Sequence, residues 1–474
     1  MYSDETNFAN KRVTIIGAAR EGTALARFLC AQRARVTLSD VRGADALADH
    51  LASVKGLPIT LVLGGHPESI LDADVFFVSP GVPLEIPILR EAVRRGIPLS
   101  SETRLFFRMC PAPIVGITGS SGKTTTTAMT GEMLRASGYQ TWVGGNIGQP
   151  LIGHLRKIRP SDKVVMELSS FQLEMLGKSP HIAAVLNITP NHLDRHPDMA
   201  SYTAAKREIL AHQGSWDVAV LGYDNPAARS LSGQCRGRVA FFSRQSAVAC
   251  GSFMDDGALM LRLNDQSEPV CERSELRLRG EHNLENALAA ALIARLAGGT
   301  LEGIAKVCRN FAGVEHRLEY VATIGGAEYY DDSIATTPER AIAAIRSFAE
   351  PIILLAGGRD KHLPWEELAD LTVQRVRHLI LFGEAAGLIA SAIDSAQQRA
   401  AGAGRLQAVH TVDQIEEAVA KSATLAQTGD VVLLSPGGTS FDAFRDFAER
   451  GARFKELVRG LQSKSDNGLK EQSS

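Results

Sequence analysis

Short runs of β-branched and aliphatic residues alternate along the chain with longer stretches rich in Ala and Leu. The run RVTIIG is followed by TALARFLCAQ, PIVGITG by KTTTTAMTGEMLRAS, and PIILLAGG by WEELADLTV. Strands that alternate with helices in this way are typical of parallel sheets covered by helices. The pattern therefore predicts an α/β fold built on parallel sheets.

Two breaks in this pattern suggest three domains. The first lies at Cys110-Pro-Ala-Pro113, because two prolines within three residues cannot sit inside a helix or a central strand. The second lies near residue 314, where the helical stretch Asn283–Leu296 and a loop around Gly313 give way to the short strands VATIG and AEYYDD. We expect domains at 1–110, 111–314 and 315–474, since domains usually run to about 100–200 residues.

The charge balance argues against a nucleic-acid or membrane partner. Lys plus Arg (51) nearly equals Asp plus Glu (53), and the net charge near -2 leaves no broad basic surface for a polyanion. Any anionic ligand must therefore be held by a few local groups.

Cysteines and termini point to a reducing compartment. The six cysteines are far apart and form no CxxC pair, which favours free thiols over zinc or disulfides. The N-terminal residues MYSDETNFANKR lack the basic start and apolar stretch of a signal peptide, and no run reaches the ~20 apolar residues of a membrane span. We expect a cytoplasmic protein, and a monomer.

A glycine-rich loop between a strand and a helix predicts a nucleoside triphosphate site. The strand Ile114–Thr118 leads into a helix through the residues Gly119, Ser120, Ser121, Gly122, Lys123, Thr124 and Thr125. Backbone N–H groups and a helix N-terminus in this arrangement bind phosphate, Lys123 adds charge, and Thr124 can ligate Mg²⁺. A strict Walker A motif needs glycine where Ile117 stands, so a Gly/Ser turn with an incidental lysine is the alternative.

Three residues further along are candidates for the metal site. Glu167 ends the apolar run Val164–Glu167, and a carboxylate at a strand end beside a phosphate loop commonly completes a magnesium shell. His192 follows the expected strand Ala183–Thr189; its spacing to other histidines matches no zinc motif, and a loop-capping role is the alternative. Lys206, on the expected helix Met199–His212, would by residue type alone lie on a solvated face.

Five motifs together resemble the Mur ligase family. They are GITGSSGKTT at 116–125, GGNIG at 144–148, ELSSFQLE at 167–174, the segment Asn187–His196 and GEHNLEN at 280–286. The family's phosphate loop reads TGxxGK[ST], which accounts for the departure from Walker A. Within the family the chain resembles the glutamate-adding branch, because of its full first domain, the ELSSFQLE phrase and the C-terminal SPGGTSFDAF at 435–444.

The resemblance implies ATP-dependent amide ligation in peptidoglycan synthesis. D-Glutamate would be joined to UDP-N-acetylmuramoyl-L-alanine through an acyl phosphate, with Lys123, His192, Lys206 and Lys361 as catalytic residues. Mg²⁺ would be held by Thr124, Glu167, His192 and Lys206, the last being carbamylated in relatives. A carbamate is anionic and offers the oxygen atoms that magnesium prefers. ATP would be bound by residues 119–125 together with Asn283, Asn286, Arg317 and Asp332.

The resemblance also implies which residues contact the two other substrates. The muramoyl substrate would meet Asn146, Ser169 and Gln172, and glutamate would meet Thr336, Lys361, Ser440, Phe441 and Phe447. Two departures flank the glutamate residues: Ile334 replaces a lysine common in relatives, and Gly437-Gly-Thr439 replaces Ala-Cys-Ala. These departures leave the handedness of the glutamate open.

The first domain resembles a dinucleotide-binding fold with a damaged fingerprint. The strand at Val13 leads into Gly17-Ala-Ala-Arg-Glu-Gly22, in which Ala19 replaces the middle glycine, and Asp40 follows the second strand. A redox role is therefore disfavoured, and in the family this domain holds UDP. Residues expected to bind it are Arg20, Glu21, Asp40, Ser79, Pro80 and Gly81.

The expected fold is thus a Rossmann-like first domain, a central phosphate-loop ATPase-type domain and a Rossmann-like third domain. Three alternatives for the function stay open at this point. One is the same ligation with L-glutamate. Another is a folate-glutamate ligase, although those relatives lack the roughly 110 residues that precede the phosphate loop here. The third is a nucleotide-sensing regulator without turnover.

Overall fold

Three β-sheets, each flanked by helices, make up the described part of the chain. The computed structural model describes residues 2–3, 5–190, 198–278, 280–360 and 363–471. Two compact units can be distinguished, Met1–Phe311 with two sheets and Ala312–Ser474 with one. The predicted α/β class with three domains is confirmed.

The first sheet is fully parallel, in the order β3-β2-β1-β4-β5. Its central strands β1 and β4 are almost continuous apolar runs, as expected for strands covered on both faces. The loops after β1, β2 and β4 meet at one edge, because parallel strands share the direction of their carboxyl ends. Its strands are β1 (Arg12–Ile16), β2 (Arg35–Asp40), β3 (Ile59–Leu63), β4 (Val75–Val78) and β5 (Leu99–Ser100), and its helices are α1 (Arg20–Ala31), α2 (Ala48–Ala52), α3 (Pro87–Arg94) and α4 (Glu102–Met109).

The second sheet has nine strands in the order β14-β13-β12-β11-β10-β9-β6-β8-β7. Its strands are β6 (Ile114–Thr118), β7 (Thr141–Gly145), β8 (Lys163–Glu167), β9 (Ile182–Val185), β10 (Val218–Gly222), β11 (Arg238–Ser243), β12 (Gly251–Asp255), β13 (Ala258–Leu263) and β14 (Gln266–Glu272). Its helices are α5 (Lys123–Ala136), α6 (Ser170–Leu173), α7 (Met199–Ala211), α8 (Pro226–Ser230), α9 (Glu281–Leu296) and α10 (Leu301–Asn310), with a 3-10 segment η3 (Leu151–Lys157). The phosphate loop leaves β6, which lies between β8 and β9.

The expectation of purely parallel sheets is wrong at one end of this sheet. Strands β12, β13 and β14 form an antiparallel meander. Its turns, Asp256-Gly257 and Asn264-Asp265, all have positive φ, the geometry of tight hairpins. Strand β9 (Ile182–Val185) also ends before the expected Thr189: Leu186 still bonds to Thr118 at the end of β6, but the next residue, Asn187, accepts from the Ser120 amide of the phosphate loop.

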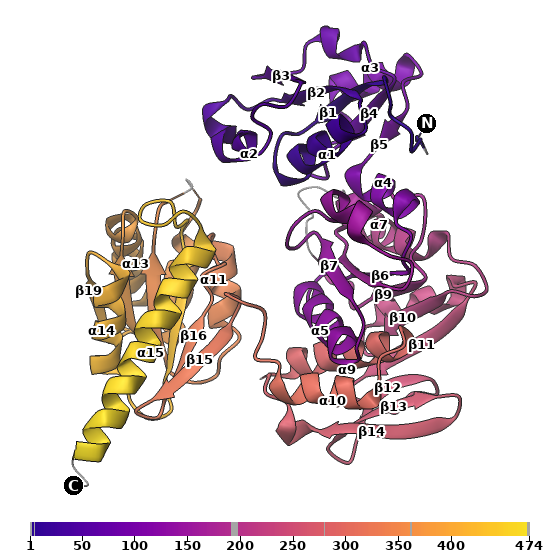
Figure 1. Ribbon diagram of the computed structural model, residues 1–474. Helices are drawn as coiled ribbons and strands as arrows, with labels where there is room; N and C mark the ends of the chain where they lie inside the picture. The colour runs from indigo at the N-terminus through magenta and orange to yellow at the C-terminus, as the bar shows by residue number, and fades with distance from the viewer. Residues whose placement is uncertain (1, 4, 191–197, 279, 361–362, 472–474) are drawn as a thin grey trace. The chain divides into compact units, whose positions relative to one another are not determined.

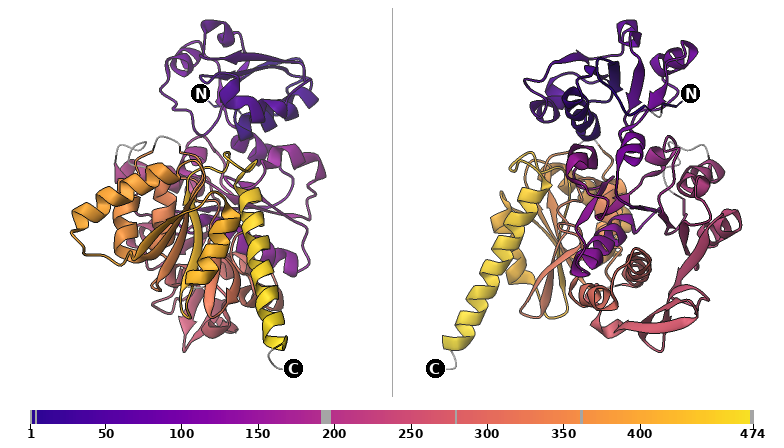
Figure 2. Two further views of the ribbon diagram at one scale, coloured as in Figure 1. Left: turned by 90° about the vertical axis from the view of Figure 1, so that its left-hand side faces the viewer. Right: turned by 45° about the vertical axis from the view of Figure 1, so that its right-hand side comes forward.

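The third sheet follows the order β15-β16-β20-β17-β18-β19, and only β15 is antiparallel to its neighbour among the described strands. Helices α11, α12 and α13 cover one face and α14 and α15 the other, with α15 running along the sheet as the yellow helix of Figure 2. Its strands are β15 (Glu319–Ile324), β16 (Ala327–Asp331), β17 (Ile352–Gly357), β18 (Val376–Phe382), β19 (Ala408–Thr411) and β20 (Val431–Gly437). Its helices are α11 (Pro338–Ile345), α12 (Glu366–Arg375), α13 (Ala386–Ala400), α14 (Ile415–Leu425) and α15 (Phe447–Glu471).

The hydrophobic cores follow this layering. In the third sheet, Leu354 and Leu433 point into one core and Ile353 and Leu355 into the other, as side-chain alternation along a strand requires. In the first unit, one core extends from α1 and α4 of the first domain to η3 and β8 of the central domain. Those two domains therefore share part of their interior.

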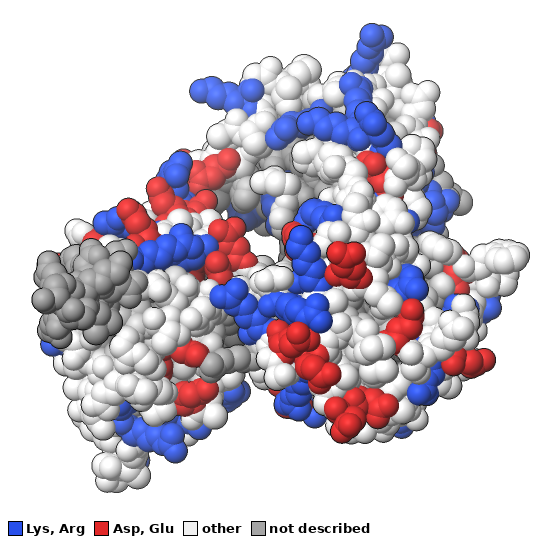
Figure 3. All heavy atoms as spheres, turned by 60° about the horizontal axis from the view of Figure 1, so that its bottom comes forward, with Lys and Arg blue, Asp and Glu red and all other residues white. Residues whose placement is uncertain are grey.

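The surface carries charges of both signs. On the face shown in Figure 3, Lys and Arg are interspersed with Asp and Glu, in keeping with their near balance in the sequence. Among the described residues, none of the helices combines the length and the hydropathy that a membrane crossing requires.

Candidate active site

The phosphate loop is a tight turn between β6 and α5. Gly122 has φ +78°, and a side chain there would lie 2.2 Å from Asn286 Oδ1, so the position needs glycine for conformation and for space. Lys123 Nζ donates to the carbonyls of Gly119 (2.9 Å) and Ser120 (3.3 Å). The N-terminus of the 14-residue helix α5 opens directly onto this turn, which is the arrangement that binds phosphate.

Neighbouring strands and helices hold the turn in place. Ser121 N donates to Asn187 Oδ1 at 2.9 Å, and Ser120 Oγ lies 3.0 Å from the carbonyl of Thr189. The hydroxyl of Tyr202, on α7, lies 3.2 Å from Ser120 Oγ. The turn is therefore supported from the end of β9 and from α7.

Oxygen ligands for a cation gather beside the turn. Thr124 Oγ1 donates to Glu167 Oε2 at 2.8 Å, and Asn146 Nδ2 donates to Glu167 Oε1 at 2.7 Å. Glu167 ends β8 and is 2 % exposed. A hydroxyl and a carboxylate held together in a buried position are the kind of oxygen ligands that Mg²⁺ takes, so the residues present fit this ion.

Lys206 lies beside the phosphate loop. The alternative interpretation, that it lies on a solvated helix face, is wrong. Its side chain is 1 % exposed, and Nζ donates to the carbonyl of Gly119 at 2.9 Å and lies 4.6 Å from the centre of the Tyr202 ring. Burial, followed by the nearby Lys123 ammonium, lowers the pKa of Lys206 to about 7, although Glu167 opposes the shift. A large fraction of the amine is therefore neutral at neutral pH.

Two predicted catalytic residues, His192 and Lys361, lie outside the described residues. Their roles stay predictions.

Two residues predicted to bind the nucleotide, Asn283 and Asn286, lie at the start of α9 next to the phosphate loop. Asn286 accepts from Thr126 Oγ1 at 3.4 Å and donates to Asn283 Oδ1 at 3.1 Å. Thr125 is half-buried on the first turn of α5. The GEHNLEN motif, far from the phosphate loop in sequence, therefore lies against it in space.

The predicted UDP residues of the first domain lie at the carboxyl edge of its sheet. Asp40 accepts from the Ala18 amide at 2.8 Å and pairs with Arg42 at 2.8 Å. Burial would raise the pKa of Asp40, but these hydrogen bonds lower it to about 2. Ser79 Oγ lies 3.3 Å from the carbonyl of Gly17, followed by Pro80 and the exposed Gly81.

Arg20 and Glu21, predicted to bind the same substrate, reach the central domain. Arg20 donates to the carbonyls of Gly148 (2.8 Å) and Asn146 (3.2 Å). Glu21 Oε1 accepts from Gln172 Nε2 at 3.0 Å, and burial raises the pKa of Glu21 well above its usual range. Gln172 in turn forms a capping box with Ser169 at the start of α6.

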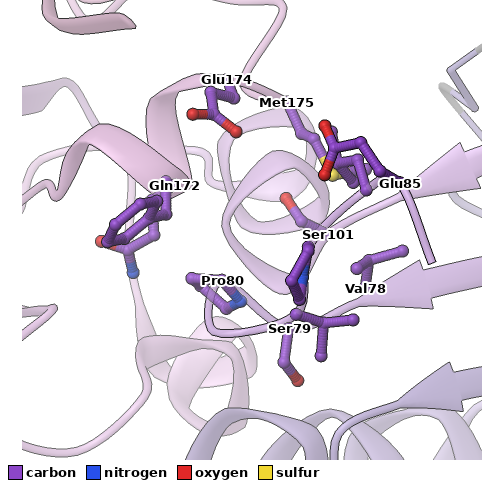
Figure 4. Close-up of a pocket in the computed structure, with 12 residues that line it drawn as sticks. Val78, Ser79, Pro80, Glu85, Ser101, Gln172, Glu174 and Met175 are labelled. Carbon is purple, nitrogen blue, oxygen red and sulfur yellow. The ribbon is translucent and has the colours of Figure 1, made fainter. Parts of the chain in front are cut away.

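A pocket opens where the first domain meets α6 (Figure 4). The loop after β4 supplies Ser79, Pro80 and Glu85, and the other wall includes Gln172 and Glu174. Three of the predicted substrate residues, Ser79, Pro80 and Gln172, thus line one pocket. The full lining is Val78, Ser79, Pro80, Val82, Pro83, Leu84, Glu85, Ser101, Phe171, Gln172, Glu174 and Met175.

In the second unit, Asp332 directly follows β16 and is buried. It accepts from Ser435 Oγ at 2.8 Å and from the Leu318 amide at 3.2 Å. Burial raises the pKa of Asp332 to about 7, although these hydrogen bonds oppose the shift. The exposed Arg317 lies between His316 and Leu318, two residues with positive φ, 61° and 44°.

The described residues predicted for glutamate follow β16 and β20 in the chain. Thr336 is half-buried in the turn after β16, and Ser440 is 1 % exposed after β20. Phe441 is 54 % exposed, and Phe447 packs edge-to-face on His316 at 6.1 Å. These two turns belong to adjacent parallel strands.

One departure from the family pattern has a structural explanation. Gly437 has φ +71°, and a side chain there would lie 2.9 Å from the Trp365 ring. Because the indole of Trp365 fills this space, glycine fits where many relatives have alanine. Nothing in the structure explains Ile334 in place of lysine.

Arg450, which was not among the predicted site residues, is fully buried on α15. Its guanidinium donates to Ser333 Oγ and to the carbonyls of Ser333, Gly438 and Thr439, over 2.9–3.3 Å. It therefore joins the turns after β16 and β20. A signal was available, because Arg450 falls at helical spacing with the core residues Phe454 and Val458.

Tyr202 was also missed. It lies four residues before Lys206 on α7, a separation that puts both side chains on one helix face. An aromatic residue at this spacing from the candidate lysine was the available signal.

Models of one family match nearly the whole chain. The Mur ligase MurD-like N-terminal domain matches residues 11–101, the Mur ligase middle domain 117–294, and the Mur ligase glutamate ligase domain 316–438. The UDP-N-acetylmuramoylalanine--D-glutamate ligase of Pelotomaculum thermopropionicum is 43% identical over 96% of this chain and 99% of its own length. The enzyme of that name from Symbiobacterium thermophilum is 42% identical over 95% of this chain and 98% of its own length.

Solved structures agree in fold. The UDP-N-acetylmuramate-alanine ligase MurC of Thermotoga maritima aligns with a TM-score of 0.56 at 18% identity, covering 95% of this chain and 100% of that one. MurF of Acinetobacter baumannii aligns with a TM-score of 0.55 at 18% identity, covering 94% and 93%. At these identities the likeness concerns the fold alone.

Proposed function

Because this chain belongs to the Mur ligase family, we propose that it joins D-glutamate to UDP-N-acetylmuramoyl-L-alanine. The chain is an ATP-dependent ligase of peptidoglycan synthesis. The observation that carries the choice of substrates is the 43% identity, over almost the full length of both chains, to a relative with that activity in its name.

The phosphates of ATP are bound by residues 119–125. The N–H groups at the start of α5 donate to phosphate oxygens, and Lys123 moves from its two carbonyl partners to the transferred phosphate. Asn283, Asn286, Arg317 and Asp332 bind the nucleotide.

Thr124, Glu167, His192 and Lys206 hold Mg²⁺, with Lys206 as a carbamate. Bound Mg²⁺ offsets the negative charge of the phosphate groups during transfer. Carbamylation forms an N–C bond between a neutral amine and CO2 as the nitrogen gives up a proton, and the lowered pKa of Lys206 provides the neutral amine at neutral pH.

The reaction proceeds through an acyl phosphate. The alanine carboxylate attacks the γ-phosphorus, an O–P bond forms, and ADP leaves. The uncharged glutamate amine then attacks the acyl carbon; phosphate leaves as the amide forms and the nitrogen gives up a proton. Lys123 and His192 offset charge on the transferred phosphoryl group.

The remaining residues bind the two other substrates. The muramoyl part is contacted by Asn146, Ser169 and Gln172, and UDP by Arg20, Glu21, Asp40, Ser79, Pro80 and Gly81. Glutamate is bound by Thr336, Lys361, Ser440, Phe441 and Phe447. The enzyme works as a cytoplasmic monomer with domains at 1–110, 111–314 and 315–474.

Phosphate release tests the proposal. The protein is incubated with ATP, Mg²⁺ and UDP-N-acetylmuramoyl-L-alanine, with D-glutamate, L-glutamate or neither. We expect release with D-glutamate only. Release with L-glutamate alone would assign the other enantiomer. A parallel incubation replaces UDP-N-acetylmuramoyl-L-alanine with a folate acceptor; release only there would assign the folate reaction, and no release under any condition would favour a regulator.

A further inference from the structure

Two adjacent residues at the start of α1 contact the central domain on both sides of the carboxyl end of β8. We propose that Arg20 is a positioning residue for Glu167 and acts through the segment Gly144–Gly148, the end of β7 and the loop that follows it. The inference rests on the proposed function in one respect, that Glu167 is a magnesium ligand.

The first link joins Arg20 to the loop. Its Nη1 donates to the Gly148 carbonyl at 2.8 Å and its Nη2 to the Asn146 carbonyl at 3.2 Å. The planar guanidinium thus spans two carbonyls of one short loop, a geometry that the single ammonium of lysine cannot reproduce.

The second link joins the loop to Glu167. Asn146 contacts Glu167 twice: its amide donates to the Glu167 carbonyl at 2.9 Å, and its Nδ2 donates to Oε1 at 2.7 Å. Gly145 has φ +93°, and a side chain there would lie 2.2 Å from the same carbonyl. The loop therefore lies directly against Glu167, and a displaced loop must shift this carboxylate.

The far oxygen of Glu167 completes the connection to the phosphate loop. Glu167 Oε2 accepts from Thr124 Oγ1 at 2.8 Å, so each of the two carboxylate oxygens has a hydrogen-bond donor from a different part of the chain. One neighbour is the phosphate loop, and the other is the loop that Arg20 holds.

Glu21 supports the other side of β8. Its Oε1 accepts from Gln172 Nε2 at 3.0 Å, while Gln172 Oε1 accepts from the Ser169 amide at 3.0 Å. Ser169 is two residues beyond Glu167. The start of α1 is therefore bonded to two backbone carbonyls of residues 146–148 through Arg20, and to the side chain of Gln172, five residues beyond Glu167, through Glu21.

The test compares three variants of the full chain, Arg20→Met, Arg20→Lys and Arg27→Met. Arg27 is the matched control, because it is an exposed arginine on the same helix. Amide hydrogen exchange of residues 144–148, without ligands, should rise about fivefold to tenfold in Arg20→Met, less in Arg20→Lys, and not in Arg27→Met.

Calorimetry of Mg²⁺ binding to the ADP complex gives a second readout. We expect the Kd for Mg²⁺ to rise about fivefold to tenfold in Arg20→Met and to recover partly in Arg20→Lys. An unchanged exchange rate or an unchanged Kd overturns the inference. So does weakened binding of UDP-N-acetylmuramoyl-L-alanine alone, which would make Arg20 only a substrate ligand.

Both readouts are independent of turnover. If the wild-type chain ligates nothing while both readouts change as expected, the proposed function fails and the positioning role stands. If ligation is normal and neither readout changes, the positioning role fails and the proposed function stands.

Discussion

Lys206 illustrates how burial changes the chemistry of a single side chain. Its amine has one carbonyl partner, the Gly119 oxygen, and the Lys123 ammonium nearby disfavours a second positive charge. Among the described residues the hydrogen-bond partner of this amine is a carbonyl and not a carboxylate, which makes the buried ammonium costly although Glu167 opposes the shift, so the pKa of Lys206 lies near neutral pH.

Lys206→Met keeps the length and apolar stem of the side chain and removes the amine. We expect ligation to fall by at least about a hundredfold, because the proposed magnesium ligand is lost, while ADP binding changes less than about threefold. Phosphate release and calorimetry measure the two effects. Arg207→Met, at the neighbouring exposed position of α7, should leave both near wild type.

The raised pKa of Asp332 should make the free energy of unfolding depend on pH. Its pKa is about 7 in the folded chain against 3.8 for an ordinary aspartate, so between these values the unfolded chain gives up the proton first. The contribution of Asp332 to stability is therefore fully present below pH 4 and is lost as the pH rises through 7.

Asp332→Asn cannot titrate and should escape this loss. Relative to wild type, the variant should gain stability on the order of 2–4 kcal/mol between pH 4 and pH 7.5. Urea unfolding at both pH values measures the difference. Asp394→Asn, exposed on α13, is the control; an equal change in both variants would contradict the prediction.

At the scale of elements, the phosphate loop and the start of α5 depend on Gly122. Gly122→Ala adds a contact at 2.2 Å to an unfavourable positive φ, whereas Gly138→Ala, at φ +91°, meets nothing within 4 Å. We expect Gly138→Ala to cost about 1 kcal/mol of stability and Gly122→Ala clearly more, with ATP affinity reduced at least about tenfold. Equal effects of the two variants on ATP binding would contradict this account.

Local elements were predictable where the sequence alone determines them. The strand, loop and helix around Lys123 were read correctly, because the phosphate turn needs glycines at fixed positions between an apolar run and a helix start. The meander β12–β14 was missed although Asp256-Gly257 is a hairpin signal, since the alternation of strands and helices elsewhere suggested parallel sheets throughout.

Properties that arise from tertiary packing could not be predicted. Lysine and arginine usually lie on the surface. Lys206 and Arg450 are buried because of the helices and turns that pack around them. The contacts of Arg20 depend on how the first domain meets the loop at 144–148, which no local pattern encodes.

At the scale of the whole molecule, the three domains differ in how independent their cores are. The described core residues of the third domain lie between 318 and 461, whereas one core runs from Phe8 to Leu231 and so includes both the first and the central domain. We expect the fragment 312–474 to fold alone with a cooperative urea transition.

The fragment 1–110 should not fold to a comparable degree. Its α4 residues Phe106 and Phe107 belong to the core shared with Leu151 and Ile152, so separation exposes them to water. Circular dichroism of both fragments tests this, and a fragment 1–110 as stable as 312–474 would contradict it. A fragment 1–311, which keeps the shared core whole, is the control.

The shared core also limits how such enzymes can be recombined. Segment η3 belongs to the central domain in sequence, yet its residues Leu151, Ile152 and Leu155 pack on helices α1 and α4 of the first domain. A chimera that transplants only residues 1–110 from a relative would pair foreign α1 and α4 side chains with a native η3. A chimera that takes the first domain from a relative should therefore also exchange residues 150–158, so that η3 and the helices it packs on come from the same protein.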